Sequence, residues 1–374
     1  MKKISTKEYY NQVLGSWYGR VAGDYIGAPI EFHPYREIEE KYGEINYYIE
    51  PIDLNYVNDD EMYEICALIA LEDAGINLNS KQIAEKWVEL LYRDNFTAER
   101  RALKNLNKGV FPPKSGTYKN VYYDAIGAQM RADIWGQITP GCPHLAKEYA
   151  IIDGAISHAG IGIEGEIFIA VLISQAFFQK DIEKNIEEAL SYLPSFKESL
   201  YSQMVLRAYE IYLKHSNDFR RGREELINYW NRIRKNVLLQ KELDKENIKL
   251  FDRKRIKFLS ERISEVHVLP NIGLIILALL YGNEDEEDPL GRSICLAAMM
   301  GLDTDCNCGN IGAILGATMG ADNIPEKWIS PLQNSFSTYV KGYEKWKITE
   351  LSERISFIGK KVISNKCEES VKIS

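Results

Sequence analysis

Residues 301–320 read GLDTDCNCGNIGAILGATMG, and this stretch decides how the chain folds. Its second half carries small residues at three- and four-residue spacing, which places them on one face of a helix (Gly309, Gly312, Ala313, Gly316, Ala317 and Gly320). Glycine costs about 1 kcal/mol per residue inside a helix. The interior glycines therefore predict that another backbone packs very closely against this helix, which has two aspartates, Asp303 and Asp305, at its mouth.

A second acidic segment, residues 57–61 (VNDDE), also leads directly into an apolar helical stretch at residues 62–74. Carboxylates at a helix N-terminus commonly cap free N–H groups and oppose the helix dipole. At the mouth of a buried helix, however, desolvated carboxylates need cations or hydrogen bonds. Oxygen ligands from Asp, Asn and Thr suit Mg²⁺, Mn²⁺ or Ca²⁺ better than zinc. Two aspartate pairs from distant parts of the chain could thus bracket a two-metal site.

The rest of the chain has mainly helical periodicity. We expect helices at residues 9–21, 61–74, 80–91, 161–178, 196–214, 271–281, 292–301 and 348–362. Gly23 and Gly27 indicate a turn after the first of these helices. Short extended pieces are indicated only at residues 47–54 and 116–123, and no internal repeat of fixed period is present. The sequence therefore predicts an all-α fold. Because no linker rich in Pro, Gly or Ser interrupts it, we expect one domain over residues 1–374, with a charged, exposed helical segment at 214–257.

Composition and charge exclude several classes of protein. The 374 residues include 46 Lys and Arg against 54 Asp and Glu, a net charge of −8, which argues against a general nucleic-acid or anionic-membrane binder. The six cysteines include no Cys-x-x-Cys pair and are too sparse for a disulfide framework. The N-terminal residues lack the apolar stretch of a signal peptide, and the longest apolar run is too short to span a bilayer. These features predict a cytoplasmic protein without a disulfide framework.

Five segments in this order resemble the ADP-ribosylglycohydrolase family, whose members are all-helical, binuclear-metal hydrolases that cleave ADP-ribose from modified protein side chains and related conjugates. The resemblance runs from residue 14 to about residue 328. It is carried by GSWYGRVAGDYIGAPIEF at 15–32, NDDEMYEICALIALE at 58–72, IGAQMRADIWG at 126–136, SHAGIGIEGEIFIAVL at 157–172 and GLDTDCNCGNIGAILGATMGADNIPEKW at 301–328.

The resemblance implies a compact orthogonal bundle of many helices with two Mg²⁺ or Mn²⁺ ions in a cleft. The positions that match the family's metal-binding motifs are Asn58, Asp59, Asp60, Asp303, Asp305 and Cys306. Glu31 matches a glutamate beside the metals that handles water or the leaving group, so the catalytic residues implied are Glu31, Asp60 and Asp305. The positions implied to approach the substrate are Asp124, Gly127, Ser157, His158 and Gly160. The implied substrate is a small or protein-attached ribosyl or ADP-ribosyl compound.

The chain also departs from the family's pattern. Threonines usually flank the first aspartate pair, where this chain has Asn58 and Glu61, and a threonine or serine usually stands at Cys306. The loop at residues 122–127 carries bulkier side chains than the loop that holds the nucleotide in the family. Three alternatives therefore remain open: hydrolysis of another glycosyl metabolite, non-catalytic binding of a nucleotide-like ligand, and acidic clusters that serve only as helix caps.

Overall fold

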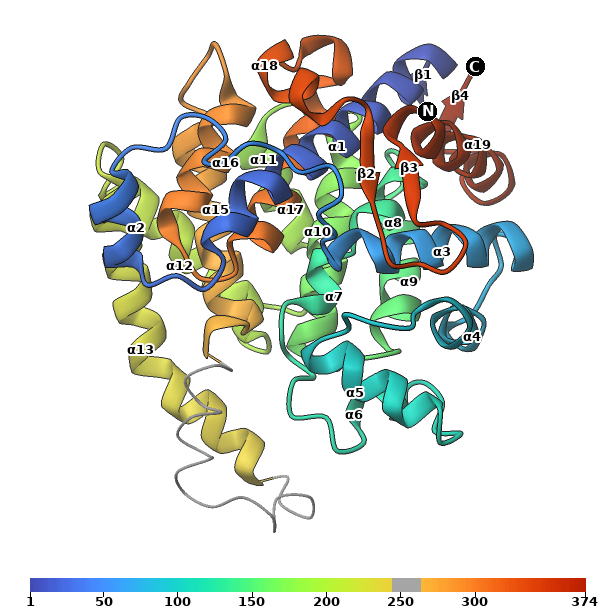
Figure 1. The fold of residues 1–374 in the computed structure, drawn as a ribbon, viewed down its shortest axis with the longest axis horizontal. Coiled ribbons are helices and arrows are strands. Elements are labelled where there is room, and N and C mark those ends of the chain that lie inside the picture. The colour runs from blue at the N-terminus through green and yellow to red at the C-terminus, as the bar shows by residue number, and fades with distance from the viewer. Residues whose placement is uncertain (244–263) are drawn as a thin grey trace.

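The computed structural model describes residues 1–243 and 264–374, and these fold into a mainly helical bundle (Figure 1). The longer helices are α1 (Thr6–Gly27), α2 (Tyr35–Tyr42), α3 (Asp60–Ala74), α4 (Ser80–Leu90), α5 (Thr97–Leu106), α9 (Pro143–Gly154), α10 (Ile161–Ala176), α11 (Ile182–Leu190), α12 (Leu200–Lys214), α13 (Phe219–Leu243), α15 (Val268–Gly282), α16 (Pro289–Met300), α17 (Thr304–Met319) and α19 (Ile348–Lys366). Short helices are α6 (Lys114–Thr117), α7 (Gly127–Met130), α8 (Asp133–Gln137) and α18 (Glu326–Ile329), with 3₁₀ turns at Ala28–Ile30, Ala321–Asn323 and Ser330–Leu332.

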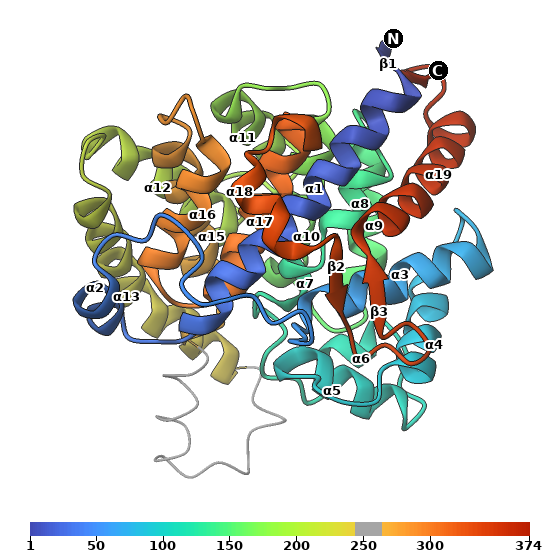
Figure 2. The same cartoon turned by 45° about the horizontal axis from the view of Figure 1, so that its top comes forward.

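Helices α1 and α17 lie side by side and antiparallel at the centre of the bundle (Figures 1 and 2). A Cβ atom added to Gly19 would lie 2.0 Å from the carbonyl oxygen of Gly312, and one added to Gly312 would lie 1.9 Å from that of Gly19. Gly15 and Gly316 face one another in the same way, at 2.4 Å and 2.0 Å. The glycines of α17 therefore have the packing role that the sequence predicted.

The first helix is longer than the sequence predicted. The glycines at 23 and 27 indicated a turn after residue 21, but α1 continues to Gly27. A Cβ atom at Gly23 would lie 2.2 Å from the carbonyl oxygen of Cys308, and one at Gly27 would lie 2.3 Å from that of Thr304. These glycines thus permit close approach of α17 rather than a turn, and they bring the end of α1 to the acidic mouth of α17.

The strand predictions were wrong. Residues 47–54 form no strand, and residues 116–123 contain the end of α6 followed by turns. The strands are three-residue pieces elsewhere: β1 (Lys2–Ile4) pairs in parallel with β4 (Val371–Ile373), and β2 (Ser335–Ser337) pairs antiparallel with β3 (Lys345–Lys347). Pieces this short carry no readable alternation, and the partner of β1 lies at the opposite end of the chain.

The structure contains one disulfide, although the cysteine content predicted no disulfide framework. Cys142, which precedes α9, is bonded to Cys367, which follows α19. The two cysteines are 225 residues apart in sequence, so local spacing gives no sign of the pairing, and only the fold brings these helix ends together. The other four cysteines are free and buried.

The charged segment at 214–257 starts at the end of α12 and continues with the long helix α13. Residues 244–257 lie outside the described residues. Among the described residues, no helix combines the length and the apolar character that crossing a bilayer requires.

Candidate metal centre

The two acidic segments meet at the N-terminal ends of α3 and α17. Asn58 Nδ2 donates a hydrogen bond to Asp305 Oδ2 at 3.2 Å, and Cys306 Sγ donates to Asp60 Oδ1 at 3.4 Å. One ligand atom each from Asp303, Asp305 and Cys306 lie within 4.8 Å of one another. The fold therefore joins two distant segments of the chain into a single, largely buried cluster of carboxylates.

Helix capping does not explain two of these carboxylates, Asp59 and Asp303. Asp59 and Asp303 occupy the N-cap positions of α3 and α17, yet neither side chain accepts a hydrogen bond from its helix. Elsewhere Asp181 caps α11 by accepting from the Lys184 N–H at 3.1 Å, and Asp288 caps α16 by accepting from the Gly291 N–H at 2.9 Å. Among the described residues, the buried Oδ1 of Asp303 has no hydrogen-bond partner. The cluster thus has oxygens available for a cation.

Burial and mutual repulsion both oppose ionisation in this cluster. Burial raises the pKa of Asp303 well above its ordinary value, and the charges of Asp305 and Glu31 raise it further. The pKa of the half-buried Glu31, which follows the 3₁₀ turn after α1, rises to about 9 because of burial and the charges of Asp305 and Asp60. A bound cation would lower the pKa of both Asp303 and Glu31, because its positive charge offsets the repulsion between the carboxylates.

The protein itself supplies a cation to the cluster, the side chain of Arg20, which the sequence did not predict. Arg20 is fully buried on α1, and its Nη2 lies 2.9 Å from Asp60 Oδ2 while its Nη1 lies 3.1 Å from Asp133 Oδ2. Its Nε lies 3.3 Å from Asp24 Oδ2, one helical turn along α1. The i, i+4 pair of Arg20 and Asp24 within a stretch of small and apolar residues was the available signal. Arg20 fixes one oxygen of Asp60 and leaves the other facing Cys306.

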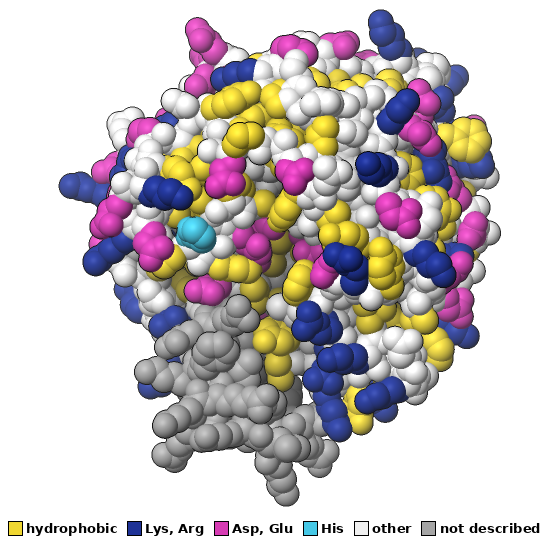
Figure 3. All heavy atoms as spheres, in the orientation of Figure 1, with side chains coloured by type: hydrophobic (Ala, Val, Ile, Leu, Met, Phe, Trp, Pro, Cys, Tyr) yellow, Lys and Arg dark blue, Asp and Glu magenta, His cyan; other side chains and the backbone are white. Residues whose placement is uncertain are grey.

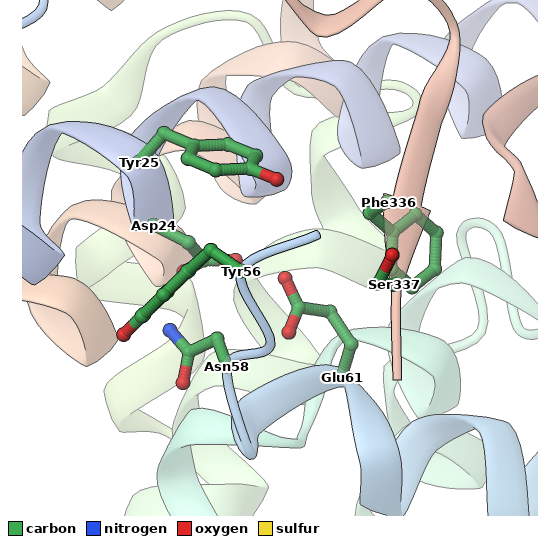
Figure 4. A pocket seen from close by; sticks show the side chains of 7 residues that line it. All are labelled: Asp24, Tyr25, Tyr56, Asn58, Glu61, Phe336 and Ser337. Atoms are coloured by element: carbon green, nitrogen blue, oxygen red, sulfur yellow. The ribbon is translucent and has the colours of Figure 1, made fainter. Parts of the chain in front are cut away.

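A small pocket opens beside the cluster (Figure 4). It is lined by Asp24, Tyr25, Tyr56, Asn58, Glu61, Phe336 and Ser337. Figure 3 shows acidic side chains inside a hollow near the middle of this face, in the region where Figure 1 places the starts of α3 and α17.

Two of the predicted substrate-binding residues are buried behind the cluster. Ser157 Oγ lies 2.7 Å from His158 Nδ1 and accepts a hydrogen bond from Arg131 Nη2 at 3.0 Å. Arg131 also pairs with Glu99 at 2.8 Å. The pKa of Asp59 is raised mainly by burial and by the charges of Asp60 and Asp305. The charge of Glu99 raises it further, so Glu99 lies close to the cluster. Arg131 belongs to the motif at residues 126–136, but its place in the sequence gives no sign of this ion-pair network.

The other three predicted residues lie around the same network. Asp124 is buried, with Oδ2 at 3.5 Å from His267 Nε2. Gly127 begins α7, and a Cβ atom there would lie 2.2 Å from Glu99 Oε1. Gly160 is exposed at the start of α10 with φ of 55°. Helix α7 reaches the cluster itself, since Met130 Sδ lies 3.7 Å from Cys306 Sγ. Contact of these five residues with a substrate stays a prediction.

A sequence profile of the ADP-ribosylglycohydrolase family matches residues 5–360. The chain belongs to the ADP-ribosylglycohydrolase family. It is 26% identical over 326 residues to an uncharacterized protein of Archaeoglobus fulgidus, covering 84% of this chain and 90% of that one. A solved structure titled ADP-ribosylglycohydrolase-related protein complex matches with a TM-score of 0.56 and 18% identity, covering 94% of this chain and 98% of that one. The family and the all-α ADP-ribosylglycohydrolase fold predicted from the sequence are thereby confirmed.

Proposed function

We propose that this protein hydrolyses a ribosyl N- or O-glycosidic bond with the help of two divalent cations, Mg²⁺ or Mn²⁺, held in the cluster. Membership of a glycohydrolase family supports the reaction class. The observation that carries the proposal is the meeting of two helix N-termini whose aspartates, Asp59 and Asp303, do not cap their helices. Such a concentration of buried carboxylates is costly unless a positive partner joins it.

The donor set fits hard cations. The oxygens of Asp59, Asp60, Asp303 and Asp305, with the amide oxygen of Asn58, are the ligand type that Mg²⁺ and Mn²⁺ prefer. When bound, such ions orient ribose hydroxyls and lower the pKa of a coordinated water. Cys306 suits them poorly, because burial and the neighbouring carboxylates raise its thiol pKa well above its ordinary value and keep it protonated.

The chain's own residues supply orientation and proton transfer. Arg20 holds Asp60 through the 2.9 Å contact and so fixes which of its oxygens faces the cluster. Glu31 stands at the end of the turn after α1, near Asp305 and Asp60, where a carboxyl group can exchange a proton with water or with a leaving group. The aromatic rings of Tyr25 and Tyr56, with centroids 6.2 Å apart, border the pocket and limit access to it.

A substrate screen tests the proposal directly. The purified protein is incubated with Mg²⁺ or Mn²⁺, or with EDTA, against ADP-ribosyl-arginine, O-acetyl-ADP-ribose and a panel of nucleosides, and released products are measured by chromatography. We expect turnover of at least one ribosyl compound that EDTA abolishes. Turnover that persists in EDTA contradicts the metal mechanism, while tight binding of intact conjugates without release favours a non-catalytic binder.

Metal addition should also stabilise the fold without any substrate. A ligand that binds only the folded state at 100 times its dissociation constant adds about 2.7 kcal/mol, which corresponds to a rise of a few degrees in melting temperature. We expect this rise on adding Mg²⁺ or Mn²⁺ to protein stripped with EDTA, measured by differential scanning calorimetry. Identical melting curves with and without either ion would show that the cluster holds no cation.

The Cys306→Ser variant should bind Mg²⁺ more tightly. A hydroxyl keeps the donor to Asp60 that the thiol provides at 3.4 Å, and it replaces a soft sulfur by a hard oxygen next to Asp303 and Asp305. We expect affinity to rise by about 3- to 10-fold in isothermal titration calorimetry, which is 0.7 to 1.4 kcal/mol.

Cys308→Ser is the matched control, since Cys308 is also buried on α17 but its Sγ contacts the carbonyl oxygen of Ile294, 3.2 Å away. Its affinity for Mg²⁺ should equal that of the unmodified protein. If both serine variants shift the affinity equally, Cys306 does not lie next to a bound cation.

A further inference from the structure

One part of this acidic protein is strongly basic. Residues 93–119 run from the end of α4 through α5 and α6, and they carry seven cationic residues against two acidic ones, while the whole chain has a net charge of −8. The cationic residues are Arg93, Arg100, Arg101, Lys104, Lys108, Lys114 and Lys119. We call the exposed side of this segment the α5–α6 surface.

Among the described residues, six of the seven cations of the α5–α6 surface have no ion pair. The exception is Arg93, which pairs with Asp94 at 2.9 Å. The other acid of the segment, Glu99, is buried on the inner side of α5, where it pairs with Arg131. All of the cations are exposed except Arg101, which is half-buried. Figure 3 shows a group of Lys and Arg side chains over the position of α5 and α6, on the same face as the acidic hollow.

Aromatic rings lie among these cations. Phe96, Phe111 and Tyr118 are 47%, 42% and 37% exposed. Each ring has a cation nearby: the Arg100 guanidinium lies 5.4 Å from the centroid of Phe96, Lys81 Nζ lies 5.1 Å from that of Phe111, and Lys119 Nζ lies 5.3 Å from that of Tyr118. Proteins that bind single-stranded nucleic acid combine cations, which contact the phosphates of its backbone, with exposed aromatic rings, on which the bases stack.

We propose that the α5–α6 surface binds single-stranded nucleic acid, with Lys and Arg contacting phosphates and Phe96, Phe111 and Tyr118 stacking on bases. The expectation against nucleic acid came from net charge, which averages over the chain and conceals a local positive surface. The surface lies outside the carboxylate cluster, so this inference does not depend on the proposed hydrolysis. Because α5 carries Glu99 on its inner side and the cations on its outer side, about one helix diameter of 10 Å separates the surface from residues near the cluster.

Fluorescence anisotropy with a labelled 20-nucleotide uridine RNA in 50 mM salt tests the proposal. We expect saturable binding that weakens as salt rises, with a logarithmic slope of about −0.7 per phosphate contacted. The triple variant K104E/K108E/K114E should lose at least 10-fold in affinity. The control K345E/K347E/K361E makes the same charge change at exposed lysines of β3 and α19 and should retain most of the binding.

The double variant F96A/F111A isolates the aromatic contribution. Stacking contributes about 1–3 kcal/mol per base, so we expect at least 5-fold weaker RNA binding with an unchanged salt slope and an unchanged melting temperature. No saturable binding, equal losses in the two lysine variants, or full binding by F96A/F111A would each overturn the proposal. Binding to phosphatidylserine vesicles without binding to the RNA would also overturn it and would identify a membrane surface instead.

Discussion

The Gly312→Ala variant is expected to be strongly destabilised. The new methyl group would lie 1.9 Å from the carbonyl oxygen and 2.4 Å from the carbonyl carbon of Gly19, and both atoms belong to the backbone of α1. No side-chain rotation can relieve this overlap, so the two central helices must separate along their contact. Overpacking costs about 1–3 kcal/mol when side chains can adjust, and here we expect at least the upper end of that range, out of a total stability of roughly 5–15 kcal/mol.

The measurement is the urea midpoint, with soluble yield recorded for a variant that does not fold. Gly273→Ala on α15 is the matched control, because the three atoms nearest to its new methyl group would be side-chain carbons of Leu226, the closest 2.7 Å away. That side chain can turn aside, and alanine favours a helix over glycine by about 1 kcal/mol. Equal midpoints for Gly312→Ala and the unmodified protein would show that α1 and α17 are not in backbone contact.

The successful predictions were those that rested on a pattern within a few neighbouring residues. The small residues of α17 are spaced along one helix face, and the two acidic segments each precede an apolar helix, so both features could be recognised within a few residues. Whether the glycines at 23 and 27 of α1 end the helix or permit close approach depends on α17, which lies far away in sequence. Local reasoning chose the turn, and the structure shows close approach to Cys308 and Thr304.

The features that the sequence did not predict depend on long-range pairing. Arg20 acquires its role only when Asp60 and Asp133, from two other helices, arrive at its guanidinium. Cys142 meets Cys367 because the ends of α9 and α19 coincide in space. The chemistry of the two aspartate pairs suggested one shared site, and the family resemblance agreed with it. In the structure Asn58 Nδ2 lies 3.2 Å from Asp305 Oδ2, so the segments before α3 and α17 do meet.

The Asp303→Asn variant is expected to abolish metal-dependent turnover while it stabilises the metal-free protein. In the absence of metal, Asp303 adds a buried carboxylate next to Asp305 and Glu31, and its Oδ1 has no hydrogen-bond partner among the described residues. An amide of the same size removes this repulsion, so the melting temperature in EDTA should rise by about 1–3 °C, equivalent to roughly 1–2 kcal/mol for a chain of this size. With Mg²⁺ present, the variant should lose the stabilisation that the unmodified protein gains, and activity should fall by at least 100-fold.

Asp181→Asn separates this effect from helix capping, because Asp181 caps α11 through the Lys184 N–H and lies at an exposed helix end. If Asp303 served its helix as Asp181 does, both variants would behave alike in EDTA and neither would change the response to Mg²⁺. Asparagine is itself a good N-cap residue, so the capping explanation predicts almost no change at either position. A rise in stability without metal, combined with a lost response to metal, is the pattern expected only if the oxygens of Asp303 are placed for a cation.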